Sequence, residues 1–133
     1  MLVNPPLHHV GIVQPSEEEA LAMMDVLGLK EVHRGYVPQF HALCIFTEAA
    51  GRSPLEFVVP DGGPLLKFNK GAGGIHHVAF EVPDLDELAR DFASRDMKLL
   101  EPEHVQGAGN FICNFLSPIY TRGLTVEYVQ IVD

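Results

Sequence analysis

One stretch near the middle of the chain decides the fold: Gly73-Gly74-Ile75-His76-His77-Val78-Ala79-Phe80-Glu81-Val82. Nearly the same pattern occurs close to the start, at Leu7-His8-His9-Val10-Gly11-Ile12-Val13. A second pattern also occurs twice, as Pro54-Leu55-Glu56-Phe57-Val58-Val59 and as Thr125-Val126-Glu127-Tyr128-Val129-Gln130. Each second copy follows the first by about 70 residues. The repeat predicts two half-size modules, each beginning with a histidine strand and ending with a glutamate strand.

The periodicity within each module predicts a strand, a helix and three further strands. In the first module these are a strand at 7–13, a helix after Ser16 that ends at Gly28, and strands at 29–37, 40–47 and 55–59. In the second they are a strand at 75–82, a helix after Pro83-Asp84, and strands at 98–105, 111–116 and 124–132. We expect one α+β domain over 1–133, with βαβββ modules at 6–60 and 74–133. The joint at 61–73 contains two short helical turns at 64–70.

Composition limits the classes of function. A hydrophobic content of 47% with 20% charged residues favours a folded globule. No apolar run approaches the ~20 residues of a membrane helix, and the N-terminus lacks the features of a secretory signal. We therefore expect a cytoplasmic protein with no membrane partner. The net charge of −9 argues against nucleic acid, which leaves a small molecule as the expected partner. Cys44 and Cys113, without CxxC spacing, are expected to be buried free thiols.

Strand alternation separates bulky residues from polar ones. His8, Val10 and Ile12 share one face of the first strand, which leaves His9 beside Gly11 on the other. In the second module His77 lies beside Ala79 in the same way. The bulky neighbours of Glu56 and Glu127 occupy one face of each strand, so alternation places both carboxylates on the other face. The pattern therefore places four polar residues on a concave, partly empty face: His9, Glu56, His77 and Glu127.

These four residues predict a metal site. Burying a carboxylate costs several kcal/mol unless something compensates its charge. Two imidazoles and two carboxylates neutralise a divalent cation and leave two positions of an octahedron for water or substrate. This ligand set suits Zn, Co, Ni, Mn or Fe(II) and does not distinguish among them. In the alternative, each histidine caps a strand and each glutamate pairs with a surface Lys or Arg. Duplication at equivalent strand positions favours the metal.

With these residues identified, the whole chain resembles the vicinal oxygen chelate superfamily, which includes glyoxalases, epimerases, dioxygenases and bleomycin-resistance proteins. The resemblance implies a glyoxalase-like fold in which two βαβββ modules form a cupped mixed/antiparallel sheet around the metal. It also implies that the first and last strand of each module supply the metal ligands, which are the four residues named above. The 73–82 stretch, the ligand set and Gly63-Pro64-Leu65-Leu66-Lys67-Phe68 look most like methylmalonyl-CoA epimerases.

The sequence departs from the epimerase pattern at one position. Epimerases carry a glutamate, a proposed base, just before the third strand of the first module, and the match places Gln39 there. An amide cannot accept a proton. Either His41 or Glu48 substitutes for it, or the protein does not epimerise.

A chelating metal stabilises the enolate that forms when an α-proton leaves a carbonyl substrate. The candidate catalytic residues are Glu127 and Glu56 as bases, with Gln39 and His41 at the second base position. The leading hypothesis is an isomerase or epimerase acting on an acyl-thioester. The alternatives are a glyoxalase I-type lyase or thiol transferase, and a non-catalytic small-molecule binding protein.

Scattered cations could meet the phosphates of an acyl-CoA tail, although such residues are more often solvated: Arg34, Lys67, Lys70 and Arg122. Superfamily members often dimerise, so the resemblance is compatible with a homodimer.

Overall fold

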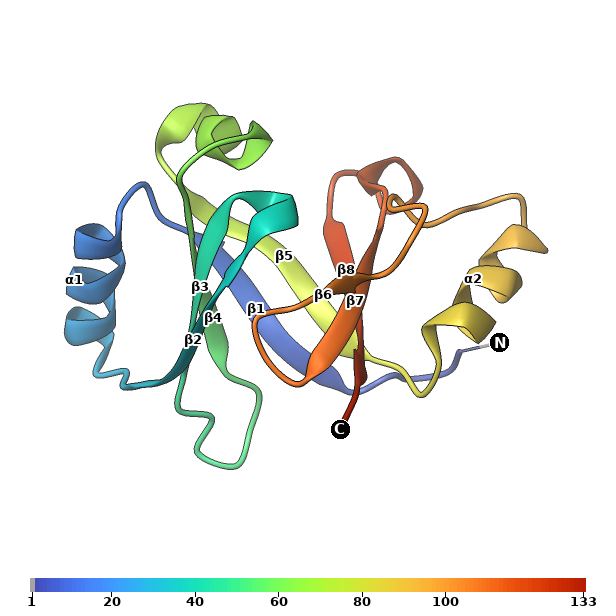
Figure 1. Ribbon diagram of the computed structural model, residues 1–133, viewed down its shortest axis with the longest axis horizontal. Helices are drawn as coiled ribbons and strands as arrows, with labels where there is room; N and C mark the ends of the chain where they lie inside the picture. Colours follow the sequence, from blue (N-terminus) through green and yellow to red (C-terminus); the bar gives the residue numbers. More distant parts are fainter. Residues whose placement is uncertain (1) are drawn as a thin grey trace. The chain divides into compact units, whose positions relative to one another are not determined.

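The computed structural model describes residues 2–133 and divides them into two compact units (Figure 1). The first unit is His9–His76. The second unit is His77–Asp133 together with the residues up to His8. The boundaries therefore fall inside the two histidine strands, and each unit is described by itself below.

The first unit holds a four-stranded sheet with one covering helix. Its elements are β1 (Leu7–Val13), α1 (Glu17–Leu27), β2 (Glu31–Val37), β3 (Ala42–Thr47) and β4 (Leu55–Pro60), with short 3-10 turns η1 (Pro38–Phe40) and η2 (Pro64–Gly71). The strand order is β2-β3-β4-β1. β1 runs parallel to β4, and the other neighbours are antiparallel. This confirms the predicted βαβββ order.

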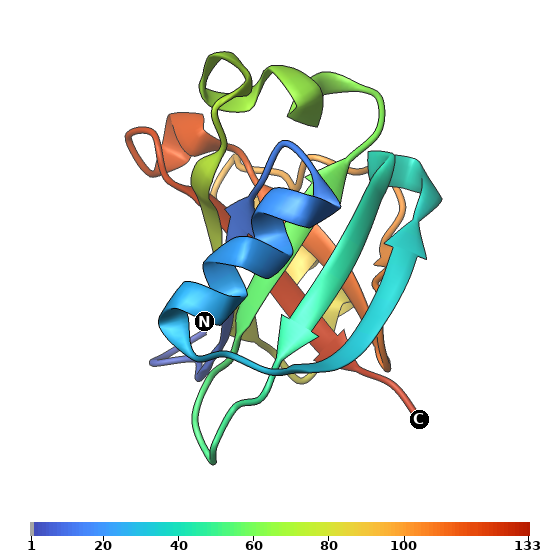
Figure 2. The ribbon, with the colours of Figure 1, turned by 90° about the vertical axis from the view of Figure 1, so that its left-hand side faces the viewer.

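Helix α1 begins and ends at the residues that the sequence predicts. The Ser16 hydroxyl accepts a hydrogen bond from the Glu19 amide at 3.1 Å, which caps the first turn. Gly28 ends the helix with a φ of 71°, a conformation that glycine adopts without strain. The helix packs on the strands through a core of Ile12, Ala20, Met24, Ile45 and Phe57. Figure 2 is turned toward this helix and shows it running along the strands of its own unit.

The buried stripe of α1 is narrower than its sequence suggests. Ala20 and Met24, one turn apart, are buried, whereas Leu21, Val26 and Leu27 are exposed. Residues four apart share a helix face, so a short helix lying on a sheet buries one such row. Three of these five apolar residues therefore lie outside the face that α1 buries.

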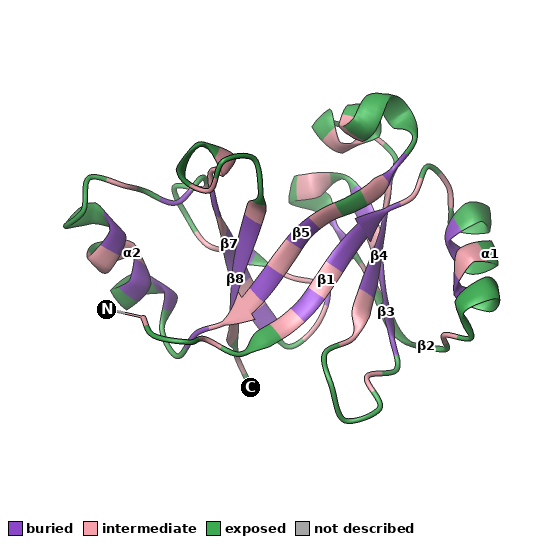
Figure 3. Cartoon of the chain, turned by 180° about the vertical axis from the view of Figure 1, so that it is seen from behind, coloured by how far each residue is buried: buried purple, intermediate pink, exposed green. Residues whose placement is uncertain are grey.

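The second unit repeats the architecture. Its elements are β5 (Gly74–Glu81), α2 (Leu85–Ala93), β6 (Val105–Gln106), β7 (Phe111–Leu116), a 3-10 turn η3 (Pro118–Tyr120) and β8 (Thr125–Ile131), with strand order β5-β8-β7-β6. β5 runs parallel to β8. Asp84 caps α2 by accepting hydrogen bonds from the Asp86 and Glu87 amides. Figure 3 shows the buried residues of both helices on the sides that face their strands.

One predicted strand of the second unit is mostly absent. The pattern predicts a strand at 98–105, but β6 contains only Val105 and Gln106, preceded by an isolated bridge between Leu99 and Leu116. Pro102 lacks the amide hydrogen that a continuous ladder needs. Nearby, the Asn114 side chain bonds to both the amide and the carbonyl of Glu101. A side chain thus replaces the neighbouring strand as the partner of this backbone.

Other predictions differ only in detail. The third strand begins at Ala42 because Pro38–Phe40 forms the turn η1. Segment η2 consists of two short turns, as predicted, with non-helical backbone at Phe68, Asn69 and Lys70 between them. Both cysteines are buried thiols that form no disulfide, as predicted. Among the described residues, no helix has the length and apolarity that spanning a membrane requires.

Candidate metal centre

In the first unit, β1 and β4 bring His9 and Glu56 together. Ile12 and Phe57 pack against α1, so alternation turns His9 and Glu56 to the opposite face of the sheet. His9 is 0% exposed and Glu56 is 5% exposed. The His9 Nε2 atom lies 3.3 Å from Glu56 Oε1. Gly11 stands opposite Glu56 in the strand register.

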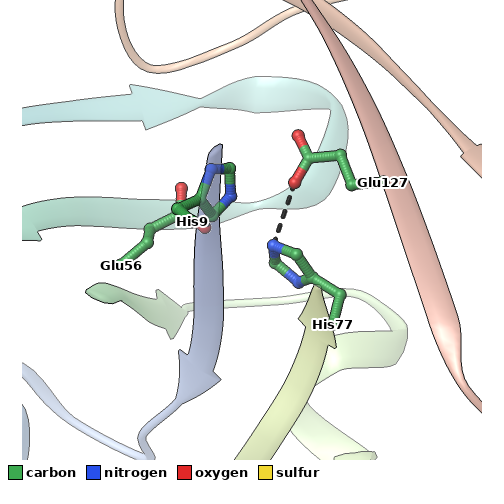
Figure 4. A group of neighbouring side chains, drawn as sticks. All are labelled: His9, Glu56, His77 and Glu127. Carbon is green, nitrogen blue, oxygen red and sulfur yellow. Dashed lines mark ion pairs between the residues drawn. The ribbon is translucent and has the colours of Figure 1, made fainter. Parts of the chain in front are cut away.

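In the second unit, β5 and β8 bring His77 and Glu127 together in the same way. The neighbours of these residues, Val78, Val126 and Tyr128, belong to the core under α2. His77 and Glu127 are each 4% exposed, and His77 Nε2 lies 2.9 Å from Glu127 Oε1. Figure 4 shows this ion pair as a dashed line, together with the His9 and Glu56 side chains.

The two pairs are constructed alike. In each, a histidine from the first strand of a module meets a glutamate from the last strand, and Nε2 is the nitrogen nearest the carboxylate. Ala79 stands opposite Glu127 as Gly11 stands opposite Glu56. All four residues are buried, and each histidine pairs with the glutamate of its own module. Their assignment as metal ligands stays a prediction.

Each histidine also contacts a phenylalanine ring that the sequence reasoning missed. The rings of His9 and Phe46 are 5.3 Å apart at 85°, and those of His77 and Phe115 are 6.0 Å apart at 90°. Phe46 stands opposite Glu56 in the register, and Phe115 stands opposite Glu127. The signal was present in the sequence, since Cys44-Ile45-Phe46 and Cys113-Asn114-Phe115 are a third repeated pattern.

The proposed second base position lies at the end of β2. Gln39 is an exposed residue of η1. His41 follows this turn with a φ of 51°, and a β-carbon placed on Gly63 would lie 3.0 Å from its ring. Glu48 is exposed just beyond the other end of β3. The roles of all three residues stay predictions.

Arg34, one of the candidate phosphate contacts, has local partners. Its guanidinium binds Glu31 at 2.6 and 2.7 Å and Glu17 at 3.2 Å. The hydrogen bonds to Glu31 and Glu17 hold the pKa of Arg34 above its usual value. Because these carboxylates already neutralise the cation, Arg34 is a poor candidate for an incoming phosphate.

Comparison with known proteins identifies the family. The sequence profile of the Glyoxalase/Bleomycin resistance protein/Dioxygenase superfamily matches residues 8–115. The chain belongs to this superfamily. Among superfamily members, bovine mitochondrial methylmalonyl-CoA epimerase is 31% identical over 130 residues, which span 93% of this chain and 73% of the relative. The uncharacterized protein YqjC of Bacillus subtilis is also 31% identical, over 128 residues, with coverage of 93% and 91%.

The fold comparison agrees. The crystal structure of methylmalonyl-CoA epimerase from Mycobacterium tuberculosis matches with a TM-score of 0.89 at 26% identity, covering 100% of this chain and 94% of the other. The predicted fold class and family resemblance are thereby confirmed. The superfamily hosts several reactions, so membership alone does not select one of them.

Proposed function

We propose that the protein is a metal-dependent isomerase of the epimerase type, which removes an α-proton from an acyl-thioester. One observation carries the proposal: each unit holds a buried glutamate paired with a buried histidine, at equivalent positions. In the proposal, both pairs serve one divalent ion bound by His9, Glu56, His77 and Glu127. Relatives named methylmalonyl-CoA epimerase support the acyl-CoA class of substrate.

The residues fit a divalent cation. Both carboxylates are at most 5% exposed, and a buried carboxylate is costly unless its charge is compensated. Each is close to an imidazole Nε2 atom, so a nitrogen and an oxygen donor are presented side by side in each unit. Two imidazoles and two carboxylates are residue types that hold metal ions, and this mixed set suits several transition metals equally.

The chemistry divides between the ion and the chain. A divalent ion held by these residues supplies Lewis acidity, which stabilises negative charge on a substrate carbonyl oxygen. Glu127 or Glu56 accepts the α-proton, because a carboxylate can act as a general base whereas the Gln39 amide cannot. Return of a proton to the opposite face of the substrate α-carbon needs a second titratable group. His41 and Glu48 are the candidates for it.

Metal content and hydrogen exchange test the proposal. Elemental analysis of the purified protein should find about one divalent ion per chain, lost in His77→Ala. The matched control is His76→Ala, because His76 is the preceding residue of β5, its ring contacts Phe68, and it is not one of the proposed ligands. The metal-loaded protein should then exchange the α-proton of methylmalonyl-CoA for deuterium, as followed by NMR.

Two results would redirect the proposal. Absence of bound metal after adding Zn, Co, Mn or Ni would favour a binding protein without turnover. Bound metal with no α-exchange on acyl-thioesters, but turnover of a hemithioacetal, would favour a lyase of the glyoxalase type.

A further inference from the structure

We propose that Phe46 and Phe115 are positioning residues that hold the rings of His9 and His77 in the plane required for metal binding. The inference rests on the proposed metal site and adds to it two residues that are not themselves ligands. It comes from contacts within each unit, and the same arrangement occurs in both.

In the first unit, the Phe46 ring stands nearly perpendicular to the His9 ring, with 5.3 Å between centroids. Phe46 is 7% exposed. It also stacks with His33 of β2, at 6.3 Å and 29°. A row of side chains thus crosses the sheet from His33 through Phe46 to Glu56, since each is paired with the next in the strand register. The phenyl ring therefore contacts two imidazoles, that of His33 on β2 and that of His9 on β1.

In the second unit, Phe115 is perpendicular to His77 at 6.0 Å. It pairs with Glu127 in the register, as Phe46 pairs with Glu56. A histidine, a glutamate and a phenylalanine therefore recur with the same strand assignments in both units. An aromatic side chain that only filled space would not need to stand edge-to-face with the paired imidazole in both places.

The physical need for such a contact comes from the imidazole itself. Rotation about the bond between Cβ and the ring is broad and roughly two-fold, because it joins sp³ and sp² atoms. A metal ion requires the Nε2 lone pair to point in one direction. A single contact between Nε2 and the glutamate leaves part of this rotation open. An edge-to-face phenyl ring restricts it further, and groups that orient ligands raise metal affinity.

The test compares leucine substitutions at three phenylalanines. Phe46→Leu and Phe115→Leu remove the flat ring but leave an apolar side chain. The matched control is Phe111→Leu, because Phe111 lies on β7 two residues before Cys113 and its ring contacts His8, 5.5 Å away at 61°. His8 is not one of the proposed ligands. Phe115→Tyr is the rescue variant, since it keeps the ring and Phe115 is only half-buried.

Two measurements report on positioning. Zn²⁺ affinity is measured by competition with a chelating dye, and the imidazole nitrogens of the metal-free proteins are followed by ¹⁵N-edited NMR. We expect Phe46→Leu and Phe115→Leu to weaken Zn²⁺ binding by about three- to tenfold, the range of one aromatic contact. In Phe115→Leu the His77 signals should shift or broaden. Phe115→Tyr should restore the Zn²⁺ affinity and the His77 signals. Phe111→Leu should change neither the affinity nor these signals, even if all three leucine variants melt at lower temperature.

Unchanged Zn²⁺ affinity and unchanged His77 signals in Phe115→Leu would overturn the inference and leave the proposed metal site intact. Equal losses in Phe111→Leu would also overturn it, by showing that general loosening explains the effect. If the wild-type protein binds no metal, the first titration shows it, and the proposed function fails together with the positioning role.

Discussion

Asn114 should be among the most sensitive positions outside the candidate site. Its side chain is 1% exposed and makes four hydrogen bonds. Its Oδ1 atom accepts from the Glu101 and Phe115 amides at 3.0 and 2.8 Å. Its Nδ2 atom donates to the Glu101 carbonyl and to His104 Nδ1, both at 3.0 Å. This one side chain ties the irregular 98–104 segment to β7.

The expected cost follows from these bonds. Each contributes a net ~0.5–1.5 kcal/mol, and an unsatisfied buried partner costs more. Replacement by leucine recovers part of the loss as apolar burial, so Asn114→Leu should destabilise the fold by about 3 kcal/mol. The unfolding entropy of a chain of 133 residues is about 0.3 kcal/mol per kelvin. The melting temperature should therefore fall by about 10 °C.

Calorimetry and urea unfolding of Asn114→Leu measure this loss directly. The control is Gln106→Leu, because the Gln106 Nε2 atom contacts three carbonyls, at 2.9, 3.0 and 3.2 Å, but the residue is exposed. Water can replace exposed bonds, so this variant should lose less than about 1 kcal/mol. Equal losses in the two variants would refute the reasoning that burial makes the Asn114 bonds important.

Two further predictions concern the backbone and the pH dependence of stability. Gly73→Ala should destabilise far more than Gly28→Ala in urea unfolding, because a β-carbon on Gly73 would lie 2.3 Å from the Val13 carbonyl oxygen while the one on Gly28 meets open space. Both glycines have positive φ, so similar losses would show that backbone conformation, and not contact, sets the cost. Burial raises the pKa of Tyr128 above its ordinary value of 10.0. The folded state then binds this proton more tightly than the unfolded state, so the stabilisation is intact below pH 10 and is lost as pH rises through the raised pKa. Wild-type stability should consequently fall more steeply than that of Tyr128→Phe in alkaline unfolding titrations, and parallel profiles would contradict this.

The accuracy of the sequence predictions varied with the range of the interactions involved. Ser16 and Gly28 limit α1 through bonds within a few residues, so the helix ends were predictable. The absence of most of the predicted 98–105 strand was not predictable. Asn114, whose side chain replaces the strand partner, lies about ten residues away and leaves no periodic signal in the sequence. The exposure of Val26 was not predictable either, since an apolar residue on a helix does not show which row of helix residues faces the sheet.

The sequence by itself determined the duplicated βαβββ pattern and the face on which His9, Glu56, His77 and Glu127 lie. Strand alternation is a local property of the backbone, and repetition made the pattern visible twice. Only the tertiary structure decided which atoms meet: that Nε2 faces the carboxylate in each pair, and that Phe46 and Phe115 stand edge-on to the imidazoles. These contacts depend on strand register and side-chain rotation, which are set by packing between residues distant in the chain.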